Sequence, residues 1–119
     1  MTPNFLNLSP NGKYLLLRTT QAVELWNLGP TGKINAPKLE HTWHSNENIT
    51  SAAFSADSQR VALLSNGGLT VSLIETATRQ SLWGTALPAP ALDVILAPDG
   101  RHVLTANSNR SIYILRSDR

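Results

Sequence analysis

A short turn sequence recurs three times in this chain of 119 residues and constrains its fold more than any other feature. Its copies are Ser9–Lys13, Ser55–Gln59 and Ala97–Arg101, which begin 46 and 42 residues apart. In two copies, proline in second place presets φ and glycine in fourth place accepts a positive φ, and all three carry Asn or Asp between them. Each copy therefore predicts a tight turn, and the regular spacing predicts an internal repeat.

The segments between these turns have the composition of β-strands. Apolar residues come in runs of four to six, rich in Leu, Val and Ile and bounded by Asn, Gly, Pro and Ser, and helical periodicity is absent. The predicted strands are Phe5–Leu8, Tyr14–Arg18, Ala22–Leu28 and Leu39–Trp43; then Ile49–Ser55, Arg60–Leu64, Leu69–Glu75 and Gln80–Thr85; then Leu92–Ala97, His102–Ala106 and Ser111–Leu115. We therefore expect an all-β chain.

A repeat of this length with four strands in each unit is typical of a β-propeller blade. We expect residues 1–119 to form a partial propeller of three consecutive four-stranded antiparallel blades. Their predicted ranges are residues 4–43, 49–85 and 92–116. The third blade lacks residues for its outer strand.

The repeats resemble the WD-repeat (Trp-Asp repeat) family over essentially the whole chain. Trp26-Asn27 stands where the family has its Trp-Asp pair, and Trp43-His44, eleven residues before Ser55, stands where it has Gly-His. The segment Pro98–Leu115 looks like the closing repeat of bacterial multi-repeat WD proteins. The resemblance implies a protein–protein interaction scaffold, the C-terminal arc of a larger bacterial protein. It leaves a second role open, as a docking or sensory arc of a bacterial enzyme such as a WD-repeat serine/threonine protein kinase.

The departures from the family pattern predict how the blades are held together. In the family a His, a Ser or Thr, a Trp and an Asp of one blade form a hydrogen-bonded tetrad. Here His44 is followed by Leu63 and Ile74 where the hydroxyl and Trp would stand, and Leu115 replaces the Trp that would accompany Thr105. We therefore expect apolar packing between sheets to replace that network. Packing is also the role we expect for Trp43 and Trp83, on the fourth strands, in preference to a recognition surface.

The predicted ring is incomplete, since propellers typically have four to eight blades. An open arc of three leaves one apolar sheet face bare at each end and a strand edge unpaired. Either the remaining blades of a longer chain close the ring, or several copies close it by head-to-tail contacts. The sequence favours the longer chain, because a ring of copies would lack one strand per copy.

Four residues are candidates for binding a protein partner: Lys33, Lys38, His44 and Arg110. The longest insertion is Gly29–Lys38, whose two lysines favour an acidic partner, although a solvated and variable loop would have the same composition. His44 and Arg110 lie in or beside turns that the family places on one rim. Arg110 could clamp a carboxylate or phosphate. The Asn and Ser in these turns need no function, because they suit turn geometry.

Residues of metal-binding type gather in one segment: Glu40, His41, His44 and Glu47. Side chains three apart on a strand point to opposite faces, so we expect no metal site there. An enzymatic propeller with a metal in its channel would need acidic or histidine residues on the first strands, where the sequence places Asn7, Ser51 and Ala53. No Ser-His-Asp arrangement and no glycine-rich phosphate loop is predicted, so we expect no cofactor and no catalysis.

Charge and composition narrow the partners further. The net charge is +2 and the ten Lys and Arg are scattered, which argues against nucleic acid and against a membrane surface. Without cysteine, neither a disulfide nor a thiolate site can form. No apolar run approaches the roughly 20 residues of a membrane helix, and the first residues do not resemble a signal peptide. We therefore expect a cytoplasmic location.

Overall fold

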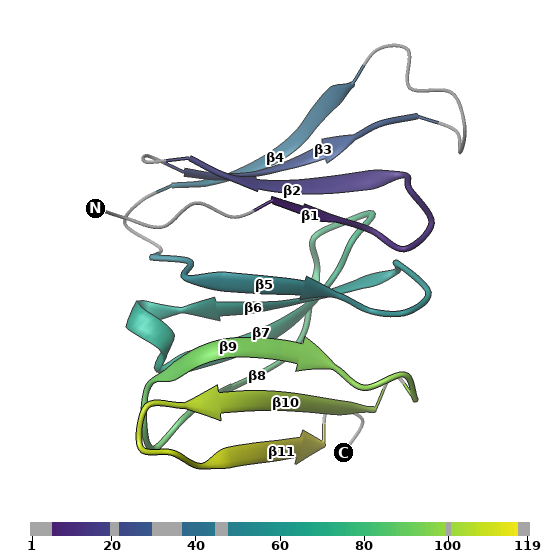
Figure 1. Cartoon of the computed structure of the whole chain (residues 1–119). Helices are drawn as coiled ribbons and strands as arrows, with labels where there is room; N and C mark the ends of the chain where they lie inside the picture. The colour runs from purple at the N-terminus through teal and green to yellow at the C-terminus, as the bar shows by residue number, and fades with distance from the viewer. Residues whose placement is uncertain (1–5, 20–21, 30–36, 45–47, 100, 117–119) are drawn as a thin grey trace.

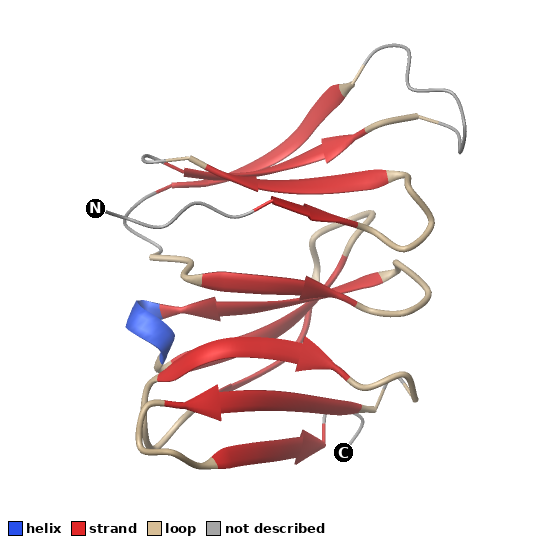
Figure 2. Ribbon diagram, in the orientation of Figure 1, coloured by secondary structure: helices blue, strands red, loops and turns tan. Residues whose placement is uncertain are grey.

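The computed structural model describes residues 6–19, 22–29, 37–44, 48–99 and 101–116. In this part of the chain eleven strands form three separate antiparallel sheets (Figures 1 and 2). The first sheet holds β1 (Leu6–Leu8), β2 (Tyr14–Arg18), β3 (Ala22–Asn27) and β4 (Lys38–His44). The second holds β5 (Ser51–Phe54), β6 (Arg60–Ser65), β7 (Thr70–Glu75) and β8 (Ser81–Ala86), with a 3₁₀ turn, η2 (Asn66–Gly68), between β6 and β7. The third holds β9 (Ala91–Leu96), β10 (His102–Asn107) and β11 (Ile112–Arg116).

The strands follow one another in sequence order across each sheet, so each sheet is a simple meander. The second strands β2, β6 and β10 occupy corresponding places in three different sheets. The first strands lie together, with β5 next to both β1 and β9 (Figure 1). The expected all-β architecture of four, four and three strands is confirmed.

The repeated turns close in the same way in all three sheets. The first residue of each turn donates its backbone N–H to the carbonyl of the residue that begins the next strand, from Ser9 to Tyr14 at 2.9 Å and from Ser55 to Arg60 at 2.8 Å. In the third turn Ala97 donates to His102 at 2.9 Å. These local bonds explain why the turn sequence also predicts the start of each second strand.

The Asn or Asp in third place stabilises each turn through its side chain. Asn11 Oδ1 accepts the backbone N–H of Lys13 at 2.9 Å, and Asp57 Oδ1 accepts that of Gln59 at 3.0 Å. Asp99 Oδ1 accepts the N–H of Arg101 at 2.8 Å in the third turn. The carboxylate and the amide thus fill the same acceptor role, but only the carboxylate titrates.

Hydrogen bonds to the charged form lower the pKa of both aspartates. The Ser55 hydroxyl and then the Gln59 N–H hold the pKa of Asp57 below its usual value, and the Arg101 N–H and then the His102 ring do so for Asp99. A carboxyl whose pKa is lower in the folded than in the unfolded chain stabilises the fold above its unfolded pKa, and the contribution disappears as pH falls through the folded value. That window begins near pH 4 and extends below it.

The double variant Asp57→Asn/Asp99→Asn should therefore lose less thermal stability in acid than the wild type. Asn11 shows that an amide fits this turn, so the variant retains the acceptor for the backbone N–H and removes the titrating carboxylates, together with the charge that Asp99 presents to the His102 ring. We expect its melting temperature, followed by circular dichroism, to fall less between neutral pH and pH about 3. An equal fall in both proteins would show that these two turns do not contribute to acid sensitivity.

Apolar packing between neighbouring sheets forms two cores. The first core joins the first and second sheets and contains Leu16, Val23, Leu25, Trp43, Ile49, Ala52, Val61, Leu63 and Ile74. The second joins the second and third sheets and contains Ala62, Leu64, Val71, Leu73, Leu87, Ala91, Val94 and Val103. Because the second sheet is buried on both faces, β6 is a continuous apolar run between Arg60 and Ser65.

The tryptophans on the fourth strands take part in this packing, as expected. Trp43 is buried in the first core, and Trp83 is half-buried against the second. Trp26 is half-buried too, and its Nε1 donates to Glu24 Oε1 at 3.1 Å. The packing role predicted for Trp43 and Trp83 is confirmed.

Candidate functional site

The first strands of the three sheets line a hollow of about 580 Å³. Its walls come from β1 and the following turn, from Thr50 and the whole of β5, and from β9. The lining residues are Asn7, Leu8, Pro10, Thr50 to Phe54, and Leu92 to Ile95. Three segments separated by about 40 residues of sequence therefore face one space, which is the concave side of the arc.

A carboxylate lies in this hollow. Asp93 is exposed on β9, and its Oδ1 accepts hydrogen bonds from Ser51 Oγ at 2.9 Å and from the Val94 backbone N–H at 2.8 Å. Among the residues that the structure describes, its Oδ2 has no hydrogen-bond partner. One oxygen is thus held in place by the second and third sheets, and the other is open to a donor from outside.

Two further polar groups border the hollow. Asn7 Nδ2 donates to the Ala52 carbonyl at 2.7 Å, which ties β1 to β5. Thr50 Oγ1 is buried and has no hydrogen-bond partner within the described segments. A buried hydroxyl without a partner is unusual, since such groups are nearly always paired. Because that hydroxyl is also closed off from solvent, it adds no accessible hydrogen-bonding group to the hollow.

The sequence analysis did not identify Asp93 as a residue of a binding site. It considered Asn7, Ser51 and Ala53 on the first strands but did not extend the comparison to the third blade. Both Ser51 and Asp93 stand four residues before a repeated turn, so aligning the repeats would have found the aspartate. The described residues hold no group of three or more His, Asp or Glu that could bind a metal ion.

The connections that follow the second and fourth strands of the sheets lie together on one rim of the arc. Asn107 Nδ2 donates to the Ala89 carbonyl at 3.0 Å, and the Ser108 N–H donates to the Pro90 carbonyl at 2.8 Å. The Leu87 N–H donates to the Leu69 carbonyl at 2.7 Å. The first two bonds link the β10–β11 turn to the β8–β9 connection, and the third joins that connection to the residue before β7 within the second sheet.

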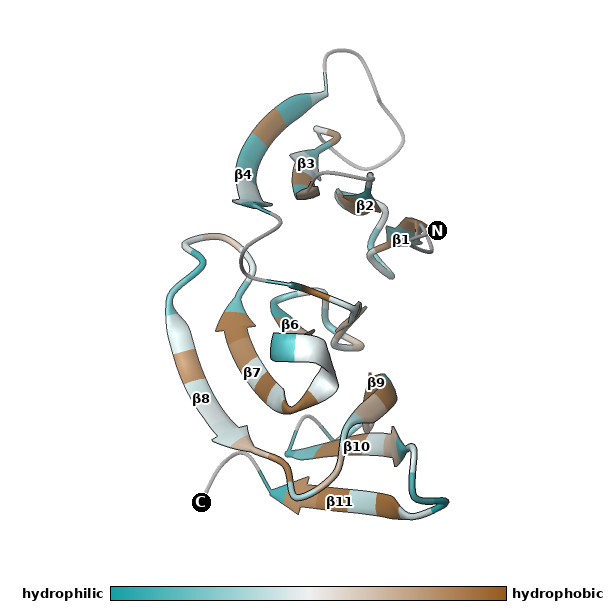
Figure 3. Cartoon of the chain, turned by 90° about the vertical axis from the view of Figure 1, so that its left-hand side faces the viewer, coloured by the Kyte–Doolittle hydropathy of each residue, from teal (hydrophilic) through white to brown (hydrophobic). Residues whose placement is uncertain are grey.

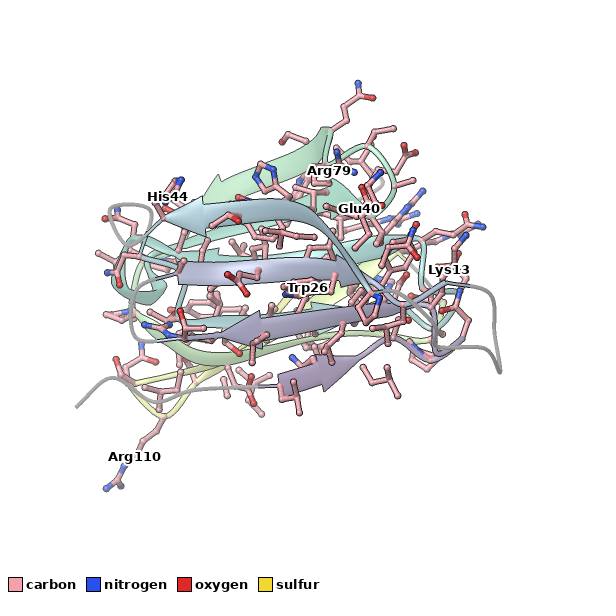
Figure 4. The ribbon with its side chains drawn as sticks, turned by 90° about the horizontal axis from the view of Figure 1, so that it is seen from above. Lys13, Trp26, Glu40, His44, Arg79 and Arg110 are labelled. Carbon is pink, nitrogen blue, oxygen red and sulfur yellow. The ribbon has the colours of Figure 1, made fainter. Side chains whose placement is uncertain are left out.

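The three predicted partner-binding residues that the structure describes do not lie together. His44, at the end of β4, and Arg110, in the turn before β11, lie on the same rim but in the first and third sheets, so they are far apart. Arg110 points away from the sheets (Figure 4). Lys38 begins β4, so it lies about 20 Å along that strand from His44. Lys33 lies outside the described residues. A binding role for each of these residues stays a prediction.

Comparison with solved structures identifies the arrangement of the sheets. The β-propeller domain of Cps50 (Swd1) from Myceliophteria thermophila superposes with a TM-score of 0.75 over 95% of this chain, at 16% sequence identity. This chain is a partial β-propeller. Its three sheets are the first, second and third blades, and the hollow lies on the channel side of the arc.

A second solved structure matches the chain at the same sequence identity. Hydrazine synthase from Kuenenia stuttgartiensis matches with a TM-score of 0.67 and 16% identity over 96% of this chain. The chain spans 37% of the Cps50 structure and 32% of the hydrazine synthase chain, about a third of each. No protein-family model and no curated protein matches the sequence. In the described part of the chain, no helix has the length and apolar character needed to cross a membrane.

Proposed function

We propose that this chain is a non-catalytic scaffold, built from divergent WD-type repeats, that binds another protein in the hollow on its channel side. The observation that carries the proposal is Asp93, a carboxylate with one oxygen fixed and one open in a hollow lined by three blades. The blades are rigid supports for such a surface, because the second blade is buried on both faces.

The chemistry of the hollow favours a basic side chain from an extended segment of the partner. An arginine or lysine would donate a charge-assisted hydrogen bond to Asp93 Oδ2, which is stronger than a neutral one. The exposed Leu92 beside it offers an apolar surface for the aliphatic stem of such a side chain.

The proposal is tested by selecting peptides from a random library displayed on phage against the immobilised wild-type chain. We expect the enriched peptides to contain Arg or Lys, and to bind Asp93→Asn about ten-fold more weakly or worse, because a hydrogen bond to a charged group contributes about 1.5–3 kcal/mol. The amide still accepts from Ser51, so the substitution removes the charge and keeps the local geometry. Binding is measured by isothermal titration calorimetry.

Asp57→Asn is the matched control, since it removes a carboxylate from the turn at the far end of β5. We expect it to bind the selected peptides like the wild type. If no peptide is enriched, or if Asp93→Asn and Asp57→Asn bind equally well, the hollow is not the binding surface.

A further inference from the structure

One oxygen of the Asp93 carboxylate is fully used by the chain itself. Oδ1 accepts the Ser51 hydroxyl from the second blade at 2.9 Å and the backbone N–H of Val94 at 2.8 Å. Each carboxylate oxygen offers about two lone-pair sites, so both sites of Oδ1 are occupied. Within the described chain no donor reaches Oδ2. A side chain from a partner therefore meets one free acceptor oxygen rather than two.

A β-bulge in β9 places an apolar side chain beside this carboxylate. Two successive residues of β10 lie opposite Asp93 and Ala91, so Leu92 between them has no partner. Consecutive side chains of a regular strand point to opposite faces, whereas Leu92 and Asp93 both line the hollow. Asp93 is the only charged residue of β9, which is mostly brown in Figure 3. The carboxylate is therefore a single charge next to a leucine that is 70% exposed.

Lysine and arginine bind a carboxylate in different ways. A guanidinium is a planar fork of N–H groups, and its strongest contact is a pair of parallel hydrogen bonds, one to each carboxylate oxygen. An ammonium is a compact charge that needs only one of the two oxygens and can keep its other N–H groups hydrated. At Asp93 the second bond of the fork has no lone pair to accept it, because the Ser51 hydroxyl occupies that site.

We propose that the hollow selects lysine over arginine in the partner's segment, and that Ser51 sets this preference. The inference rests on the proposed function, because it concerns what binds to the same carboxylate. A lysine retains its full contact, since Oδ2 accepts its ammonium and the exposed Leu92 packs against its four-carbon stem. An arginine loses one of its two bonds and with it the usual advantage of the fork. The selectivity thus comes from blocking the competitor.

Replacing Ser51 by alanine should shift the preference toward arginine. The substitution frees one lone pair of Oδ1, while the Val94 N–H still holds the carboxylate on β9. A guanidinium can then bond to both oxygens. Because one further hydrogen bond to a charged group corresponds to about ten-fold in affinity, we expect the ratio of arginine to lysine affinity to rise by about that factor. Any loss of order at Asp93 weakens both kinds of contact alike, so this ratio is the quantity to compare.

Isothermal titration calorimetry on the full chain measures the ratio with a matched pair of peptides. The pair is the selected peptide whose binding depends most on Asp93, synthesised once with lysine and once with arginine at its basic position. We expect the wild type to bind the lysine peptide more tightly. Ser51→Thr retains the hydroxyl and should retain the preference for lysine. Ser81→Ala, on the outer strand β8, is the control and should leave both affinities unchanged.

Two results would overturn the inference. One is an arginine peptide that binds the wild type as tightly as the lysine peptide, a comparison that needs no variant to fold. The other is an unchanged ratio in Ser51→Ala. In either case, binding that Asp93→Asn still weakens would leave the proposed function standing, so the two failures are distinguishable. If no selected peptide depends on Asp93, the proposed function fails and this inference fails with it.

Discussion

Replacing Leu73 by alanine should lower the free energy of unfolding by about 2–5 kcal/mol, whereas replacing Ile114 should lower it by less than about 1 kcal/mol. The two residues occupy the same position in consecutive blades. Leu73 is 1% exposed between the second and third blades, and Ile114 is 68% exposed at the end of the arc. Removing buried methyl groups loses their transfer free energy and leaves a cavity, and neither loss applies to an exposed side chain.

The comparison is made by urea denaturation followed by circular dichroism. Similar losses for the two substitutions would mean that the third blade does not cover Leu73, or that Ile114 is not exposed. The alignment of Ile114 with Leu73 in the repeat would then be wrong.

Sequence reasoning succeeded where the determining interactions are local. The turns at residues 9, 55 and 97 close through bonds within a few residues, so the predicted strand Tyr14–Arg18 has the observed bounds, and Arg60–Leu64 is short by one residue. The two-sided burial of the second sheet is also visible in the sequence, because β6 reads as an unbroken apolar run. Strand periodicity and turn chemistry together were sufficient for the three-sheet architecture.

The candidate site depends on contacts between blades, which local sequence does not encode. Ser51 and Asp93 are 42 residues apart and meet only because β5 and β9 are adjacent first strands. For the same reason, the sequence did not show how the predicted binding residues lie relative to one another. Lys38 and His44 were chosen for chemistry and loop position, but they occupy opposite ends of one strand. The bulge between Leu25 and Trp26 likewise has no signal in the sequence.

The join between the second and third blades also depends on one close contact that the sequence does not reveal. Gly68 ends η2 with a φ of +88°, and a Cβ built there would lie 2.3 Å from the carbonyl oxygen of Ala91, the first residue of β9. That distance is far inside van der Waals contact, and the obstacle is backbone, which cannot move without displacing β9. Glycine is therefore required here by both conformation and space.

Gly68→Ala should accordingly destabilise the chain by about 2–5 kcal/mol, the sum of a left-handed backbone penalty of about 1–2 kcal/mol and an overpacking cost of about 1–3 kcal/mol. Gly12→Ala is the matched control, because Gly12 has a φ of +73° with no atom within 4 Å of its Cβ position. It should incur the backbone penalty alone. The difference between the two unfolding free energies in urea isolates the contact with Ala91, and equal losses would show that η2 does not press against the third blade. Because that contact sets how closely the third blade approaches the second, Gly68→Ala should also expose Leu73 and increase binding of an apolar dye, which Gly12→Ala should not.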